Sequence, residues 1–185
     1  MSPSVSFLVV IMKKILYIHG YNSSSESRTA QVLLAHLGEG FELIHPTFSN
    51  DPEEAIPMAR RIIREEGVDM VVATSLGGFV ALSLRGIPKF VINPSVAPHL
   101  TLPNNGYDGD LSSFERLSKV IWDDIDEAER TNTTGLFGLN DELFSYRDIF
   151  STHYAHVIET EDSHHVLDET ITDIVIPHIH SYFGK

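Results

Sequence analysis

Strand-like and helix-like segments alternate along the chain, and this alternation restricts the fold more than any other feature of the sequence. Strands separated by helices form βα units, in which each helix returns the chain to pair the next strand in parallel. The runs rich in β-branched and aromatic residues lie at 14–20, 41–48, 68–74, 89–93, 132–141 and, with its exit loop, 155–165. We therefore predict an α/β fold with a mostly parallel sheet flanked by helices.

The segment 51–67 shows most clearly how a helix is encoded in this chain. Asp51 can cap its first turn, Pro52 suits the first helical position, and Gly67 can end it. Further helices are predicted at 30–37, 76–85 and 142–154, in one or two pieces of 112–130, and in a C-terminal segment that Pro177 should kink or interrupt.

One domain is the natural expectation for 185 residues, of which 42% are hydrophobic and 21% charged. No internal repeat or low-complexity linker divides the chain, so we predict a single domain over residues 1–185.

Residues 1–12 are a possible N-terminal extension. The apolar run within them is too short to cross a bilayer and has no basic residue before it, unlike a signal peptide. Either this run adds an edge strand, or Met12 is the true start.

The charge balance excludes several classes of partner. The formal net charge is −13, from 26 acidic and 13 basic residues, and no basic cluster is available to neutralise nucleic-acid phosphates or an anionic membrane surface.

The absence of cysteine removes disulfides, thiolate metal sites and a cysteine nucleophile, and fits the cytoplasm. The oligomeric state is left open.

The stretch VVATSLGGFVAL (71–82) passes from strand to helix within about two residues, with Ser75 at the turn. Its ATSLG core resembles the G-x-S-x-G nucleophile elbow, in which the residues two before and two after the serine crowd each other and must be small. Ala73 and Gly77 meet this demand. Ser75 is therefore the candidate nucleophile, and the alternative is a serine that only caps a helix.

A serine nucleophile needs a base and an acid, which follow it in the chain order Ser, Asp or Glu, His. Asp141 comes directly after a predicted strand and is the candidate acid, although it could instead only cap the next helix. Its neighbour Glu142 is the less suitable carboxylate, and Asp162 is too close to the histidines to come from a separate loop. His164 and His165 are both candidates for the base, and we favour His164.

An oxyanion hole would use the backbone N–H of Leu76 and one from the loop after the first strand, where Tyr21 is the best candidate. His19 in that loop precedes the serine and is assigned to the structure of the loop. The adjacent histidines could suggest a metal, but the chain has no H-E-x-x-H and no matching carboxylate spacing. We expect neither a metal nor an organic cofactor.

Several motifs together resemble the small bacterial esterases of the YqiA/YcfP type, within the α/β-hydrolase superfamily. In order they are ILYIHGYNSS, ATSLGG, FVINPS, GLNDEL and EDSHHVL, and the likeness covers nearly all of residues 13–183. The resemblance implies an α/β-hydrolase fold with a minimal lid that acts on acyl esters or thioesters. It places the nucleophile at Ser75, the acid at Asp141 and the base at His164. Ala73 stands where the family usually has glycine.

The sequence thus predicts a serine carboxylesterase or thioesterase for a small-molecule substrate with a short or medium acyl group. Acyl transfer by the same residues and a non-catalytic protein-binding module on the same fold are the alternatives. Residues 95–130 are expected to supply the walls of the acyl pocket. Their apolar candidates are Leu100, Leu102, Phe114, Leu117 and Trp122, and ordinary core is the preferred interpretation for most of them.

Overall fold

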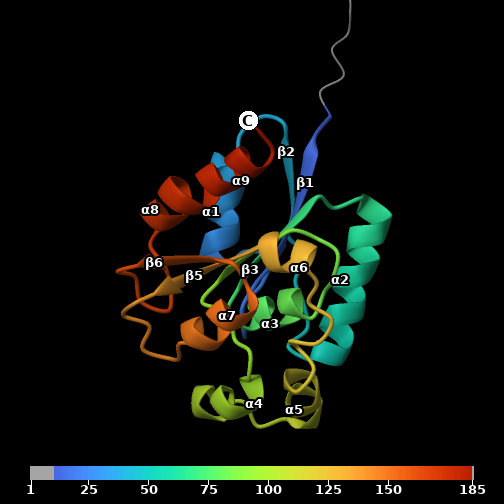
Figure 1. The fold of residues 1–185 in the computed structure, drawn as a ribbon, viewed down its shortest axis with the longest axis vertical. Helices are drawn as coiled ribbons and strands as arrows, with labels where there is room; N and C mark the ends of the chain where they lie inside the picture. The colour runs from blue at the N-terminus through green and yellow to red at the C-terminus, as the bar shows by residue number, and fades with distance from the viewer. Residues whose placement is uncertain (1–10, 185) are drawn as a thin grey trace, which may run out of the picture.

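The computed structural model describes residues 11–184, and the strands in this range form one parallel sheet (Figure 1). The strand order is β2-β1-β3-β4-β5-β6, and every adjacent pair is parallel. The strands are β1 Lys13–Ile18, β2 Phe41–Ile44, β3 Met70–Thr74, β4 Lys89–Ile92, β5 Thr133–Gly138 and β6 His156–Thr160. The predicted α/β fold is confirmed. The possible extension at residues 1–12 falls almost entirely outside the described residues, and the single-domain expectation stays a prediction.

Helices cover both faces of the sheet (Figure 1). One face packs against α1 and the C-terminal helices, and the other against α2, α3, α5 and α7. The helices are α1 Arg28–His36, α2 Pro52–Glu66, α3 Leu76–Leu82, α4 Pro98–Thr101, α5 Ser112–Ser118, α6 Glu127–Thr131, α7 Arg147–His153, α8 Asp168–Thr170 and α9 Ile176–Tyr182, with a 3₁₀ turn η1 at Pro103–Asn105 and a π turn η2 at Ile171–Val175.

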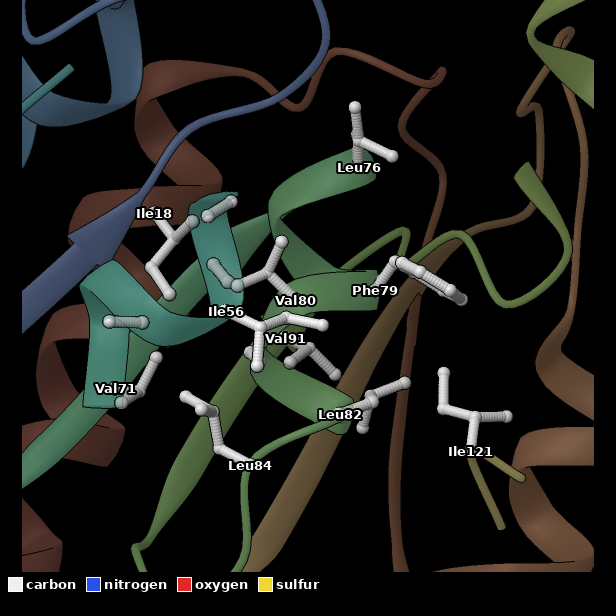
Figure 2. Close-up of a cluster of buried hydrophobic side chains, with 14 of the residues drawn as sticks. Ile18, Ile56, Val71, Leu76, Phe79, Val80, Leu82, Leu84, Val91 and Ile121 are labelled. Carbon is white, nitrogen blue, oxygen red and sulfur yellow. The ribbon is translucent and has the colours of Figure 1, made fainter. Parts of the chain in front are cut away.

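The two faces hold two hydrophobic clusters, because successive strand residues point to opposite sides. In β1, Leu16 and Ile18 belong to the cluster under α2 and α3, whereas Ile15 and Tyr17 belong to the cluster under α1 and α9. Figure 2 shows part of the first cluster, with side chains from β1, β3 and β4 meeting those of α2 and α3. The core therefore fixes α3, and with it the turn that precedes this helix, against the sheet.

One predicted helix is shorter in the structure, and the C-terminal one is interrupted near Pro177. Residues 142–146 are not helical, because the Asp141 carboxylate accepts hydrogen bonds from the N–H groups of Leu143 and Phe144 and holds a turn there. The C-terminal helix continues through Pro177, but the chain widens into the π turn η2 immediately before α9. A proline ring clashes with the carbonyl group four residues earlier, and the wider turn relieves that clash.

A buried ion pair ties α6 to β4 at the end of the sheet where the strands begin. The Lys89 side chain is fully buried and donates to the Glu129 carboxylate and to the carbonyl oxygen of Ile87 (3.1 Å). Glu129 also accepts from the N–H of Gly86 at 3.1 Å. Burial lowers the pKa of Lys89, and the neighbouring carboxylate opposes this effect only in part. The lysine charge therefore depends on Glu129.

We expect Glu129→Ala to lower the free energy of unfolding by about 3–5 kcal/mol, because it leaves the Lys89 ammonium buried without a counter-charge. Urea unfolding of the variant beside the native protein measures the loss. Glu115→Ala is the matched control, since it removes an exposed ion pair with Lys119 and should leave the stability close to native. Equal losses in the two variants would contradict this account.

Candidate functional site

Ser75 occupies a strained turn between β3 and α3. Its φ and ψ are 51° and −118°, a conformation that residues with side chains rarely adopt. The end of β4 and the loop after it hold it there: the Ser75 N–H donates to the carbonyl oxygen of Ile92, and the Ser75 carbonyl oxygen accepts from the N–H of Ser95, both at 3.0 Å. The turn thus projects the hydroxyl beyond the carboxyl end of the sheet.

Close backbone contacts explain the small residues around this serine. A Cβ atom added at Gly77 would lie 2.2 Å from the carbonyl oxygen of Ile18 in β1. One added at Gly78 would lie 2.6 Å from the Cβ of Pro94. The glycines of the S-L-G-G stretch therefore allow the start of α3 to touch the sheet, which a larger residue would prevent.

The structure brings Ser75, His164 and Asp141 into one hydrogen-bonded row. His164 Nε2 lies 3.0 Å from Ser75 Oγ, and His164 Nδ1 lies 2.8 Å from Asp141 Oδ2. The side chains of His164 and Asp141 are 3% and 2% exposed. Because a carboxylate only accepts, Nδ1 carries the proton and Nε2 is free to accept from the serine hydroxyl.

The neighbouring candidates lie outside this row. The His165 ring is exposed and stands beside the His164 ring, with centroids 5.4 Å apart. The Glu142 carboxylate accepts from the backbone N–H of His164 at 3.0 Å, and this bond lowers the pKa of Glu142. The Asp162 carboxylate accepts a hydrogen bond from the backbone N–H of Leu167 at 3.0 Å. The Glu142 and Asp162 carboxylates thus hold the backbone of the loop around His164.

Asp141 has two roles in the local structure. One carboxylate oxygen holds the turn at Leu143 and Phe144, and the other faces His164. The Phe144 ring in turn packs edge-on against the His164 ring, with centroids 4.8 Å apart. Asp141 therefore caps a turn instead of a helix. The hydrogen bonds of this turn fix the orientation of the carboxylate that His164 contacts.

Tyr21 and Leu76, the residues whose backbone N–H groups are named for an oxyanion hole, both line the cavity beside Ser75. Their N–H groups donate to no acceptor within residues 11–184. Both ring nitrogens of His19, by contrast, have hydrogen-bond partners. Its Nε2 accepts from the N–H of Phe48 and its Nδ1 contacts the carbonyl oxygen of Gly20, both at 2.8 Å. It holds the loop that carries Tyr21, as expected from the sequence.

A cavity of about 590 Å³ opens at Ser75. Its apolar walls come from Ile92, Leu102, Leu143, Phe144 and Val166. Among the five apolar candidates in residues 95–130, only Leu102 lines it, and ordinary core, the preferred interpretation, holds for three of the others. The others serve elsewhere: Phe114 is buried in the core, Trp122 stacks on the His153 ring, Leu117 packs at the edge of the core and Leu100 is 64% exposed.

Asn93, which is not among the site residues predicted from the sequence, connects three parts of the site. Its amide nitrogen donates to the carbonyl oxygens of Ser163 (3.2 Å) and His164 (2.9 Å), and its amide oxygen accepts from the N–H of Gly138 (2.8 Å). It is buried and has a positive φ of 42°, which asparagine tolerates better than most residues. The I-N-P tripeptide after β4 was the available signal.

Within residues 11–184, no group of three or more His, Asp or Glu side chains is arranged to hold a metal ion. Over the same range, no helix is both long and apolar enough to cross a membrane.

Residues 14–175 match the family described as Uncharacterised protein family (UPF0227). The chain belongs to this family. UPF0227 comprises the YqiA/YcfP-type proteins, so the resemblance that the sequence motifs carry is confirmed.

Solved structures share the fold of this UPF0227 chain at low identity. Est1E from Butyrivibrio proteoclasticus with bound ferulic acid gives a TM-score of 0.72 at 17% identity, covering 95% of this chain and 91% of that one. The esterase RhEst1 from Rhodococcus sp. ECU1013 gives 0.65 at 11%, covering 95% and 92%. A metagenomic epoxide hydrolase from hot environments gives 0.64 at 11%, covering 94% and 91%. The α/β-hydrolase fold is thereby confirmed.

We expect Asn93→Gly to release the loop that carries His164, because glycine accepts the positive φ but makes none of the three hydrogen bonds. The low-field proton resonance of the His164 Nδ1–H should weaken or disappear in NMR spectra. Asn93→Ala should cost about 1 kcal/mol more stability, since alanine also strains the backbone. Asn104→Ala, at an exposed position, is the control. An unchanged resonance in Asn93→Gly would show that Asn93 does not position His164.

The Asp162 carboxylate should make the free energy of unfolding depend on pH in the acid range. Burial alone would raise its pKa, but hydrogen bonds from the Thr170 hydroxyl and the Leu167 N–H outweigh burial and hold the pKa below its ordinary value of 3.8. As pH falls, the folded protein therefore takes up this proton at a lower pH than the unfolded chain does. The stabilisation by the ionised Asp162 carboxylate is complete above its ordinary pKa and is lost as pH falls through its lowered pKa in the folded protein.

Urea unfolding at several pH values tests this sign. The stability difference between native protein and Asp162→Asn should be largest near neutral pH and shrink below about pH 4. Glu161→Gln changes the exposed neighbour and serves as control. A difference that grows towards acid pH would contradict the assignment.

Proposed function

We propose that this protein is a serine hydrolase that cleaves carboxylic esters or thioesters of short or medium acyl groups. The observation that carries the proposal is the buried row from Asp141 through His164 to Ser75, with the serine held in a strained turn. Such a row is the arrangement that activates a serine hydroxyl on several unrelated folds. Strained backbone of this kind is also concentrated at functional sites.

In the proposed reaction, Ser75 Oγ attacks the carbonyl carbon of the substrate while His164 Nε2 takes its proton. The tetrahedral oxyanion accepts hydrogen bonds from the N–H groups of Tyr21 and Leu76, which have no other acceptor in the described chain. His164 then gives the proton to the leaving alcohol or thiol, and the acyl group stays on Ser75. Water, deprotonated by His164, releases the acid and restores the serine.

Asp141 supports each proton transfer without taking the proton itself. It accepts from His164 Nδ1–H, which keeps Nε2 directed at Ser75 and stabilises the imidazolium that forms. Because the two N–H groups in the turn bind the other carboxylate oxygen, the orientation of the acid is fixed before substrate arrives. The cavity of about 590 Å³ is of the size that binds small molecules.

Labelling with a fluorophosphonate tests the nucleophile directly. We expect one adduct on the native protein by intact mass, and none on Ser75→Ala. His164→Ala should slow labelling by about 10⁴-fold or more, and His165→Ala by far less, because only His164 contacts the serine oxygen. Ser83→Ala, at the other end of α3, is the matched serine control.

The result also separates the alternatives. An adduct with no turnover of esters or thioesters in water, but turnover with an added alcohol or amine acceptor, would favour acyl transfer. Absence of any adduct between neutral and alkaline pH would refute the nucleophile and favour the protein-binding module.

A further inference from the structure

A row of hydroxyl groups lines the cavity next to the nucleophile, and the proposed reaction uses none of them. Ser27 Oγ donates to the Tyr17 phenol oxygen at 3.4 Å, and that oxygen lies 3.0 Å from Thr74 Oγ1. All three residues belong to the cavity wall, and Thr74 directly precedes Ser75. The row therefore extends from the start of α1 to the residue beside the nucleophile.

These hydroxyls stand out from the face of the sheet on which they lie. The neighbouring positions of β1, β3 and β4 on this face are apolar, and the polar Thr134 of β5 is paired with the His178 ring of α9; the apolar positions are Ile15, Met70, Val72, Phe90 and Ile92. Phenylalanine and valine would fill the places of Tyr17 and Thr74 with similar shape, and replacing both partners of a buried hydrogen bond by apolar groups is nearly neutral for stability. Packing alone does not account for the hydroxyls.

Counting protons shows that the row has one donor left over. Ser27 gives its proton to Tyr17, so two protons remain for the single contact between Tyr17 and Thr74. If Tyr17 donates, the Thr74 hydroxyl proton is unused, and if Thr74 donates, the phenol proton is unused. No other acceptor for either group is found within residues 11–184. Whichever direction the row takes, one O–H remains available at the cavity wall.

Ser95 supplies a second, independent group of the same kind. Its hydroxyl is buried, lines the same cavity and has no hydrogen-bond partner among the described residues. Its backbone N–H donates to the carbonyl oxygen of Ser75, which places it beside the nucleophile. A buried hydroxyl without a partner costs free energy unless a ligand satisfies it.

The charges around the cavity narrow the ligand class. No Asp or Glu is among the described residues that line it, and the one guanidinium there, of Arg28, is paired with the Asp168 carboxylate through two nitrogens. The Asp168 carboxylate therefore already balances the Arg28 charge, and the described lining residues offer an anionic group no unpaired lysine or arginine. An uncharged oxygen, such as a hydroxyl, can both accept from the spare O–H donors and donate to their lone pairs.

We propose that Tyr17, Thr74 and Ser95 form a polar subsite that binds an uncharged hydroxyl group of the substrate close to the scissile ester. The inference rests on the proposed hydrolysis and narrows its substrates to hydroxylated esters. The hydroxyl can belong to the alcohol, as in a polyol ester, or to the acyl group, as in a hydroxy-acid ester. The apolar residues Leu102, Leu143 and Phe144 bind the remaining, apolar part.

Two matched ester pairs distinguish these sources. Glycerol monobutyrate against propyl butyrate tests the alcohol side, and methyl 3-hydroxybutyrate against methyl butyrate tests the acyl side. We expect the native protein to prefer the hydroxylated member of one pair by about tenfold in kcat/KM. Tyr17→Phe, Thr74→Val and Ser95→Ala should each reduce this preference about threefold to tenfold, as the loss of one neutral hydrogen bond predicts.

The ratio of kcat/KM values does not depend on how much of a variant is folded, because both substrates meet the same preparation. Tyr182→Phe, at an exposed position in α9, is the matched tyrosine control and should keep the native ratio. If the native protein shows no preference in either pair, or if all three variants keep the native ratio, the subsite is refuted while hydrolysis stands.

A binding experiment keeps the two proposals separable. The four esters are titrated into Ser75→Ala and followed by amide chemical shifts, which requires no turnover. If fluorophosphonate labelling fails but the hydroxylated esters bind more tightly, the subsite stands without the proposed function. Equal affinity for hydroxylated and plain esters would refute the subsite whether or not Ser75 is a nucleophile.

Discussion

The close contact between the start of α3 and the end of β1 determines where every other part of the site must lie. Gly77 brings the helix so near the carbonyl oxygen of Ile18 that no side chain fits between them. This approach, together with the hydrogen bonds of the Ser75 backbone to the segment at and after β4, forces the positive φ of the serine. Strain of this kind costs about 1–3 kcal/mol and persists only where the surroundings determine it fully, as two packed clusters do here.

The loop that carries His164 reaches Ser75 because polar side chains from several directions hold its backbone. Asn93 binds two of its carbonyl oxygens from the end of β4, Glu142 binds the N–H of His164, and Asp162 binds the residues that follow. Gly138 adds a close contact, since a Cβ there would lie 2.4 Å from the carbonyl oxygen of Asp162. The loop has no regular secondary structure, so these side chains take the place of a backbone ladder in satisfying its polar groups.

The parts of the molecule that could be predicted from sequence are those with local causes. Strand runs, the caps of α2 and the small residues around Ser75 follow from period, propensity and sterics, and the structure contains them. The choice of His164 over His165 follows from the family resemblance, because adjacent residues differ only in which one the loop directs inward. Apolar character alone does not tell whether Phe114 faces a cavity or the core, so the sequence does not single out Leu102 as the wall residue among its five candidates. The sequence does not reveal the role of Asn93, because its hydrogen-bond partners lie 45 to 71 residues away along the chain.

The fold leaves the reaction open, since it also occurs in an epoxide hydrolase at a similar level of structural likeness. What distinguishes this chain is the chemistry at the carboxyl ends of its strands. A serine in a strained turn faces a histidine whose proton position is fixed by a carboxylate, and that carboxylate is fixed by its own turn. Beside them, hydroxyl groups with spare donors and apolar side chains both line the cavity. The first arrangement argues for acyl chemistry, and the second argues for substrates that are themselves divided into a polar and an apolar part.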